Sequence, residues 1–218
     1  MTIEPGNPRS ARTKAALIAA GLRLLSQRPI DAVTVDDIVQ AAEVGKGSFY
    51  NHFADREALA RAITAQIRAS IETAVTRSNA GVTDPARRMA RAICTYWRYA
   101  LDEPEHAGVL VHIHTGHTSL TAPLNHGLVE DLETGLASGR FDIATVESGF
   151  LYVLGVTQLA LVRIVQEPNR ALAISLTQQM CALVLRGLGV DGAEAAQIAA
   201  QASDAIVRKR PAPPAAAN

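Results

Sequence analysis

Apolar side chains recur along most of the chain at spacings of three and four residues, the period of one face of an α-helix. The expected helices cover, in chain order, residues 10–27, 34–42, 46–52, 55–78, 85–101, a short stretch from 104, 123–137, 143–166, 171–188 and 191–207. The first helix is expected to bury a stripe made of Ala11, Ala15, Ile18, Leu22 and Leu25. No segment has the apolar–polar alternation of a half-buried strand. The pattern therefore predicts an all-α fold.

Polar residues at the expected helix starts support these boundaries. Thr34 and Asp37 have the spacing of a capping box, in which a hydroxyl and a carboxylate each satisfy a backbone N–H. Asp191 and Glu194 repeat that spacing at the last helix. Pro29 ends the first helix, because the residue before a proline avoids the helical conformation.

The expected helices group into two domains. We expect a flexible N-terminus at 1–9, a three-helix domain at 10–57, a domain of six or seven helices at 58–207 and a disordered Pro- and Ala-rich tail at 208–218. The longest apolar run, residues 149–165, contains polar side chains and is slightly short for a membrane span. We therefore interpret it as part of a buried helix and expect no membrane partner.

The composition adds little to this interpretation. The 218 residues are about half apolar and only 4% aromatic, and 21 Lys and Arg balance 21 Asp and Glu. Residues 1–60 carry seven basic and seven acidic side chains, so that segment has no net positive charge. Cys94 and Cys181 lie in apolar helical patterns and predict buried thiols rather than a disulfide. The chain starts without an apolar leader, which favours a cytoplasmic location.

Residues 34–59, TVDDIVQAAEVGKGSFYNHFADREAL, predict a helix-turn-helix, in which two short helices are joined by a tight turn. A recognition helix exposes small or polar residues where its N-terminal end meets base edges and phosphates. Here that end contains Gly45, Lys46, Gly47 and Ser48. The glycines let the backbone approach DNA, the lysine supplies positive charge, and the serine can donate or accept a hydrogen bond. The segment therefore indicates sequence-specific DNA binding. The basic side chains of residues 1–60 must then cluster on the DNA side, with Asp31, Asp36, Glu43 and Glu57 turned elsewhere.

The same segment resembles the DNA-binding signature of the TetR family of transcriptional regulators. The matching residues are Thr34, Ile38, Ala41, Ala42, Val44, Lys46, Gly47, Phe49, Tyr50, His52, Phe53, Glu57 and Leu59. Ser48 and Arg56 stand where the family commonly has Thr and Lys. Glu43 replaces a common turn glycine. Gly45 replaces a common serine, which removes a side chain that could cap the recognition helix.

This resemblance implies roles for individual side chains. Those implied to contact the DNA backbone are Arg12, Thr34, Lys46, Tyr50, His52 and Arg56, with Arg9 and Lys14 as further candidates. Those implied to face the bases are Gly47, Ser48 and, as a possible further contact, Asn51. Phe53 is expected in the core. Tyr50 is expected outside it, because its neighbour Phe49 faces inward. His52 fits a DNA contact or a packing role equally well.

A single helix-turn-helix buries too little surface for tight specific binding, so we expect a homodimer on a pseudo-palindromic operator in double-stranded DNA. The very apolar helices at 143–166 and 171–188 are the expected dimer interface, as the resemblance also implies. It further implies a repressor that leaves its operator when a small-molecule effector binds the larger domain. The residues we expect around that effector are Trp97, His114, Phe150, Tyr152 and Gln158.

Other functions stay open at this point. An activator, or a regulator without an effector, would carry the same motif. Five of the six histidines lie between His106 and His126, which makes a metal-responsive regulator an alternative. We nevertheless expect no metal site and no cofactor, because no cysteine lies nearby in the sequence. Residues 80–207 show no constellation typical of catalysis, so an enzyme with a vestigial helix-turn-helix is not expected.

Overall fold

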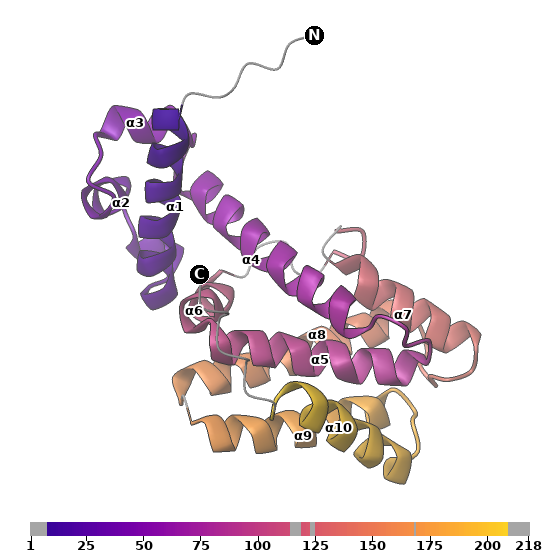
Figure 1. Cartoon of the computed structure of the whole chain (residues 1–218). Helices are drawn as coiled ribbons and strands as arrows, with labels where there is room; N and C mark the ends of the chain where they lie inside the picture. The colour runs from indigo at the N-terminus through magenta and orange to yellow at the C-terminus, as the bar shows by residue number, and fades with distance from the viewer. Residues whose placement is uncertain (1–7, 114–118, 123–124, 168, 209–218) are drawn as a thin grey trace, which may run out of the picture. The chain divides into compact units, whose positions relative to one another are not determined.

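The computed structural model describes residues 8–113, 119–122, 125–167 and 169–208. These residues form ten α-helices and one short 3-10 helix and contain no strand, which confirms the predicted all-α fold (Figure 1). The elements are α1 (Pro8–Gln27), η1 (Ile30–Ala32), α2 (Val35–Ala41), α3 (Lys46–Tyr50), α4 (Arg56–Ser78), α5 (Pro85–Asp102), α6 (Pro104–His112), α7 (His126–Ala137), α8 (Val146–Gln166), α9 (Arg170–Gly187) and α10 (Gly192–Ile206).

The chain divides into two compact units. The first consists of Met1–Ala69 and Glu103–Thr115, and the second of Ser70–Asp102 and Gly116–Asn218. The first unit differs from the domain expected at 10–57 in two ways. It continues along α4, which runs past residue 57 without a break, and it includes α6, which packs against α1.

The buried face of α1 differs from the predicted stripe. The helix buries Leu17, Ala20, Gly21 and Leu25, whereas the first two residues of the expected stripe are exposed. A Cβ atom at Gly21 would lie 2.8 Å from Cδ1 of Ile63 on α4. The two helices therefore cross at close range at this glycine. Since α1 has apolar residues on several faces, this crossing decides which of them turns inward.

The C-terminal end of α1 is covered by α6. A Cβ atom at Gly108 would lie 2.4 Å from the carbonyl oxygen of Ser26, so the two helices touch backbone to backbone. Nδ1 of His112 donates to the carbonyl oxygen of Leu25 at 3.1 Å. This bond satisfies one of the carbonyls that a helix end leaves without an intrahelical partner.

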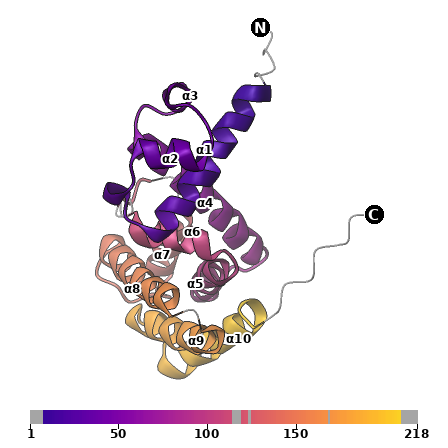
Figure 2. The same ribbon diagram turned by 90° about the vertical axis from the view of Figure 1, so that its left-hand side faces the viewer.

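In the second unit α5 is the central helix, because α7, α8, α9 and α10 all pack against it (Figures 1 and 2). Its Trp97 is fully buried, and the indole N–H donates to the carbonyl oxygen of Thr157 on α8 at 3.2 Å. Cys94 on α5 and Cys181 on α9 are buried free thiols, as predicted. The contact with Cys181, together with burial, raises the pKa of Cys94 well above its usual value.

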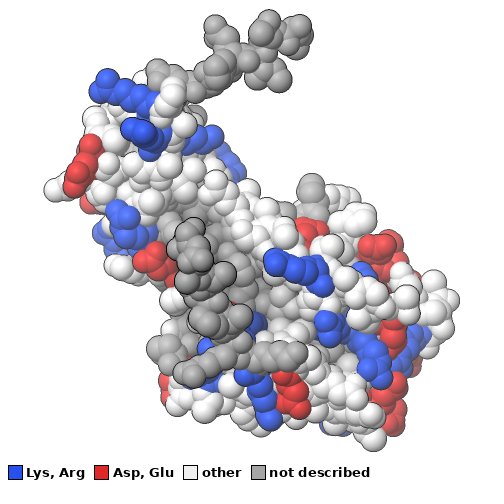
Figure 3. Space-filling model, in the orientation of Figure 1, with Lys and Arg blue, Asp and Glu red and all other residues white. Residues whose placement is uncertain are grey.

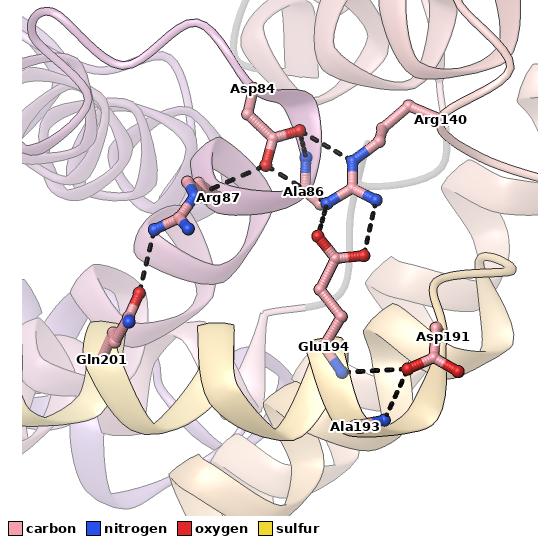
Figure 4. Close-up of polar contacts among 8 residues, drawn as sticks. All are labelled: Asp84, Ala86, Arg87, Arg140, Asp191, Ala193, Glu194 and Gln201. Atoms are coloured by element: carbon pink, nitrogen blue, oxygen red, sulfur yellow. Dashed lines mark hydrogen bonds and ion pairs between the residues drawn. The ribbon is translucent and has the colours of Figure 1, made fainter.

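An ion-pair network joins the start of α5, the segment before α8 and the start of α10 (Figure 4). Arg140 donates from Nε to Asp84 at 2.8 Å, and from Nη1 and Nη2 to Glu194 at 2.9 and 2.7 Å. Asp191 caps α10 by accepting hydrogen bonds from the N–H groups of Ala193 and Glu194, as its spacing predicted. The Glu194 carboxylate, however, bonds Arg140, so the reciprocal half of the expected capping box is replaced by this ion pair.

α8 is the one described helix that is long and apolar enough, by length and composition, to cross a membrane, a test that core helices also pass. It begins at a capping box formed by Thr145 and Ser148, slightly later than expected. Its Phe150 is fully buried, but Leu151 and Leu159 are 47% and 73% exposed. Within one chain, therefore, only part of the surface of α8 is covered.

Candidate nucleic-acid interface

α2 begins with the predicted capping box. The N–H of Asp37 donates to Oγ1 of Thr34 at 3.1 Å, and the backbone N–H and hydroxyl of Thr34 each donate to Oδ2 of Asp37 at 2.9 Å. The bond from the Thr34 backbone, followed by that from its hydroxyl, holds the pKa of Asp37 below its usual value. The box fixes Thr34 at the exposed start of α2.

The turn between α2 and α3 contains Glu43 with φ of 55°, the left-handed conformation in which glycine is favoured. The N–H of Val44 closes the turn by donating to the carbonyl oxygen of Val39 at 3.0 Å. Gly45 then begins α3 with no side chain to cap it. The turn thus keeps its geometry although Glu43 stands where a glycine is common.

Two aromatic residues anchor α3 to the first unit. Phe49 and Phe53 are 0% and 6% exposed, and their ring centroids lie 5.9 Å apart. Tyr50 is 53% exposed, and its ring makes an edge-to-face contact with Phe49. The predictions of a buried Phe53 and an exposed Tyr50 are therefore confirmed. The aromatic anchor leaves the opposite side of α3 free to meet a ligand.

That side of α3 carries the small and polar residues singled out in the sequence. Lys46, Gly47 and Asn51 are exposed, whereas Ser48 and His52 are half-buried. Nothing lies within 4 Å of a Cβ atom built at Gly47, so a nucleic-acid backbone can approach closely here. On α1, Arg12 is also exposed.

Lys46 forms an ion pair with a carboxylate on this surface. Its Nζ lies 2.8 Å from Oδ1 and 3.2 Å from Oδ2 of Asp36 on α2. Hydrogen bonding to Asp36, with the charge of that carboxylate, raises the pKa of Lys46. In Figure 3 acidic and basic side chains both occur on the face of the first unit that is shown. The expectation that Asp36 turns away from the cations is therefore wrong, because the crossing of α2 and α3 pairs its carboxylate with Lys46.

Arg56, implied by the family resemblance to contact DNA, is bound within the protein. Nη1 donates to the carbonyl oxygen of Val33 at 3.2 Å, Nη2 pairs with Asp31 at 3.3 Å, and Nε pairs with Glu57 at 2.8 Å. The bond to Glu57 contributes most to a raised pKa of Arg56. These contacts tie the start of α4 to the segment before α2, so the guanidinium positions the helix-turn-helix.

The residues expected around an effector lie in different surroundings within the second unit. Trp97 and Phe150 are fully buried in the core of the second unit. Tyr152 is 36% exposed, and its hydroxyl donates to the carbonyl oxygen of Leu183 on α9 at 3.1 Å. The side chain of Tyr152 therefore packs along α9, and its place around an effector stays a prediction. His114 lies outside the described residues.

Two polar groups of the second unit stand out. The hydroxyl of Tyr96 on α5 donates to Oε1 of Gln158 on α8 at 3.3 Å, so Gln158 faces α5. Thr95 is 7% exposed, and its hydroxyl has no hydrogen-bond partner among the described residues. Thr95 could not be singled out from the sequence, since a single threonine in an amphipathic helix carries no signal.

The histidine cluster is only partly described, because His114 and His117 lie outside the described residues. His112 is bonded to α1, and His126 is exposed beside Glu130, with Nδ1 4.0 Å from the carboxylate. Within the described ranges, no three His, Cys, Asp or Glu side chains are placed to hold a metal.

Comparison with known proteins places these features in a family. Residues 17–63 match the model of bacterial regulatory proteins of the tetR family, and residues 84–201 match that of the tetracyclin repressor-like C-terminal domain. RolR, solved in complex with resorcinol, is 28% identical, with a TM-score of 0.69 over 88% of this chain and 95% of RolR.

Two curated regulators match over shorter stretches. The transcriptional regulator AcuR of Cereibacter sphaeroides is 41% identical over 51 residues, 23% of each chain. The transcriptional repressor DhaR of Mycobacterium sp. (strain GP1) is 35% identical over 75 residues, 34% of this chain and 37% of DhaR. The chain thus matches well under half the length of either relative. One of the two family models covers more than half of the chain, and the exposed recognition helix agrees with both. This chain therefore belongs to the TetR family of DNA-binding transcriptional regulators.

Proposed function

We propose that the protein is a repressor that binds a pseudo-palindromic operator as a homodimer and is released by a small hydroxylated aromatic effector. The observation that carries the DNA-binding part is the exposed start of α3, held on a buried Phe49–Phe53 anchor. Lys46 and Tyr50 are assigned to phosphates, and Ser48 with Asn51 to base edges. Arg56 acts through its contacts with η1 and with Val33, before α2, and not through a phosphate.

The dimer part of the proposal rests on α8 and α9. Leu151, Leu159, Leu172 and Leu183 are between 37% and 73% exposed on these two helices. Large apolar side chains concentrated on one surface mark an interaction site. A second copy of the chain would cover them and place two recognition helices on successive half-sites of one operator.

The effector part rests on the second unit. RolR, one of the similar solved structures, was solved in complex with resorcinol, a benzene ring with two hydroxyl groups. In this chain the buried hydroxyl of Thr95 lacks a partner among the described residues, and Tyr96 with Gln158 supplies a second polar pair. A buried polar group without a partner is costly, so a ligand that bonds it gains affinity. We therefore place Thr95 in the effector site in addition to Gln158.

The test is fluorescence anisotropy of a labelled DNA fragment from the promoter of the protein's own gene, compared with a shuffled fragment. We expect preferential binding to the promoter and release by resorcinol or a similar phenol. Thr95→Val keeps the shape of the side chain and removes the hydroxyl, so it should weaken release by about tenfold and leave DNA binding unchanged. Release by a divalent metal ion instead of a phenol would favour the metal-responsive alternative. Retained promoter binding with increased transcription would indicate an activator.

A further inference from the structure

We infer that Asp36 is a built-in competitor for the DNA contact of Lys46, and that it limits the affinity of the protein for DNA of any sequence. The inference rests on the proposed DNA binding by α3. It concerns a carboxylate on the neighbouring helix that has no assigned role in that binding.

The geometry brings one ammonium to one carboxylate on the exposed surface of the helix-turn-helix. Lys46 is the first residue of α3, and Asp36 is the second residue of α2. Nζ of Lys46 lies within hydrogen-bond distance of both carboxylate oxygens of Asp36, at 2.8 Å from Oδ1 and 3.2 Å from Oδ2. The two side chains remain 56% and 72% exposed.

An ion pair this exposed contributes little to folding, because water solvates both charges almost as well. Its effect on DNA binding is larger. A carboxylate and a phosphate both offer anionic oxygens to the same ammonium. When a phosphate approaches Lys46, the lysine must leave Asp36 or be shared, and the carboxylate then faces the phosphate at close range. This penalty does not depend on the bases, since neither group reads them.

Other carboxylates of the first unit are engaged differently. Asp37 closes the capping box of α2, and Asp31 pairs with Arg56. Glu43, in the adjoining turn, is exposed and forms no ion pair with another described residue. Glu43→Gln therefore removes one negative charge from the turn that joins α2 and α3 without releasing Lys46, and it serves as the matched control.

The experiment measures Kd by anisotropy on the promoter fragment and on an unrelated fragment across a series of salt concentrations. Asp36→Asn should tighten binding to both fragments by about 3- to 10-fold, the effect of one unit charge a few Å from a phosphate in water. It should also steepen the salt dependence by up to about one unit. Lys46→Ala should weaken binding to both fragments and reduce the salt slope by about one unit.

The double variant distinguishes the mechanism. In a Lys46→Ala background, Asp36→Asn should change affinity by less than about twofold, because the competitor has lost its target. If Asp36→Asn raises the affinity for DNA equally in the unaltered protein and in Lys46→Ala, the inference is overturned in favour of a general charge effect. The same holds if Glu43→Gln raises the affinity as much as Asp36→Asn does. An unchanged or weakened affinity of Asp36→Asn, with unaltered urea unfolding, would overturn it directly. If the unaltered protein binds neither fragment, the proposed function fails together with this inference.

Discussion

At Glu43 the backbone adopts φ of 55°, a conformation that costs an L-residue roughly 1 kcal/mol or more and costs glycine almost nothing. Glu43→Gly should therefore raise the free energy of unfolding by about 0.5–1 kcal/mol, after allowing for the greater flexibility of glycine in the unfolded chain. Urea unfolding monitored by circular dichroism measures this change.

The matched control makes the opposite change, from glycine to an L-residue, at another residue with left-handed backbone conformation. Gly139 has φ of 67° with nothing within 4 Å of its Cβ position, so Gly139→Ala introduces strain without a clash. It should lower stability by about 1 kcal/mol. If Glu43→Gly instead lowers the free energy of unfolding, the Glu43 side chain must stabilise the folded protein by more than the backbone strain costs.

At the scale of single elements, α8 and α9 carry the exposed leucines that we assign to the dimer. Leu159→Glu on α8 and Leu183→Glu on α9 should each weaken dimerisation by at least about 100-fold, because a buried unpaired charge is costly. Sedimentation velocity at micromolar concentration measures the change. Leu176 is unsuitable for this test, since it is half-buried against the core of its own chain.

Ala196→Glu, on the exposed side of α10, adds the same charge outside α8 and α9 and should leave the dimer intact. Each variant should keep the helical content of the unaltered protein, because both leucines are largely exposed. Dimers that persist in both leucine variants would place the interface on other elements.

At the scale of the whole molecule, Arg140 links three segments of the second unit that are distant in sequence (Figure 4). Burial raises the pKa of Asp84, but the hydrogen bond and charge of Arg140 outweigh it and hold the pKa below its usual value. A carboxyl group whose pKa is lowered by folding stabilises the protein above its unfolded pKa, and this contribution is lost in acid.

Arg140→Gln should therefore lower the free energy of unfolding by about 1–2 kcal/mol near pH 7, a value reduced by partial exposure of the network. As the pH falls below about 4, Asp84 is protonated first in the unfolded chain and, below its lowered pKa, also in the folded protein, so the difference from the unaltered protein should shrink progressively. Urea unfolding between pH 3 and pH 7 tests this expectation. Arg140→Lys, which cannot bond both carboxylates in a bidentate manner, should give an intermediate loss. A constant difference at all pH values would mean that the arginine acts by packing alone.

Features that depend on residues close together in the chain could be predicted from the sequence. Helix positions follow from apolar periodicity, and the capping box at Thr34 follows from a three-residue spacing, so both were confirmed. The helix-turn-helix is likewise a local motif of about 25 residues. Burial of Phe53 and exposure of Tyr50 followed from the helical period around Phe49.

Features that depend on how close two helices approach were decided only by the tertiary structure. The inward face of α1 depends on its crossing with α4 at Gly21, and α6 joins the first unit because Gly108 admits the backbone of α1. The partners of Arg56 and Lys46 are likewise set by neighbouring elements. Sequence spacing gives the direction of a side chain from its own helix. It does not give the distance to the next helix, and hydrogen bonds and ion pairs depend on that distance.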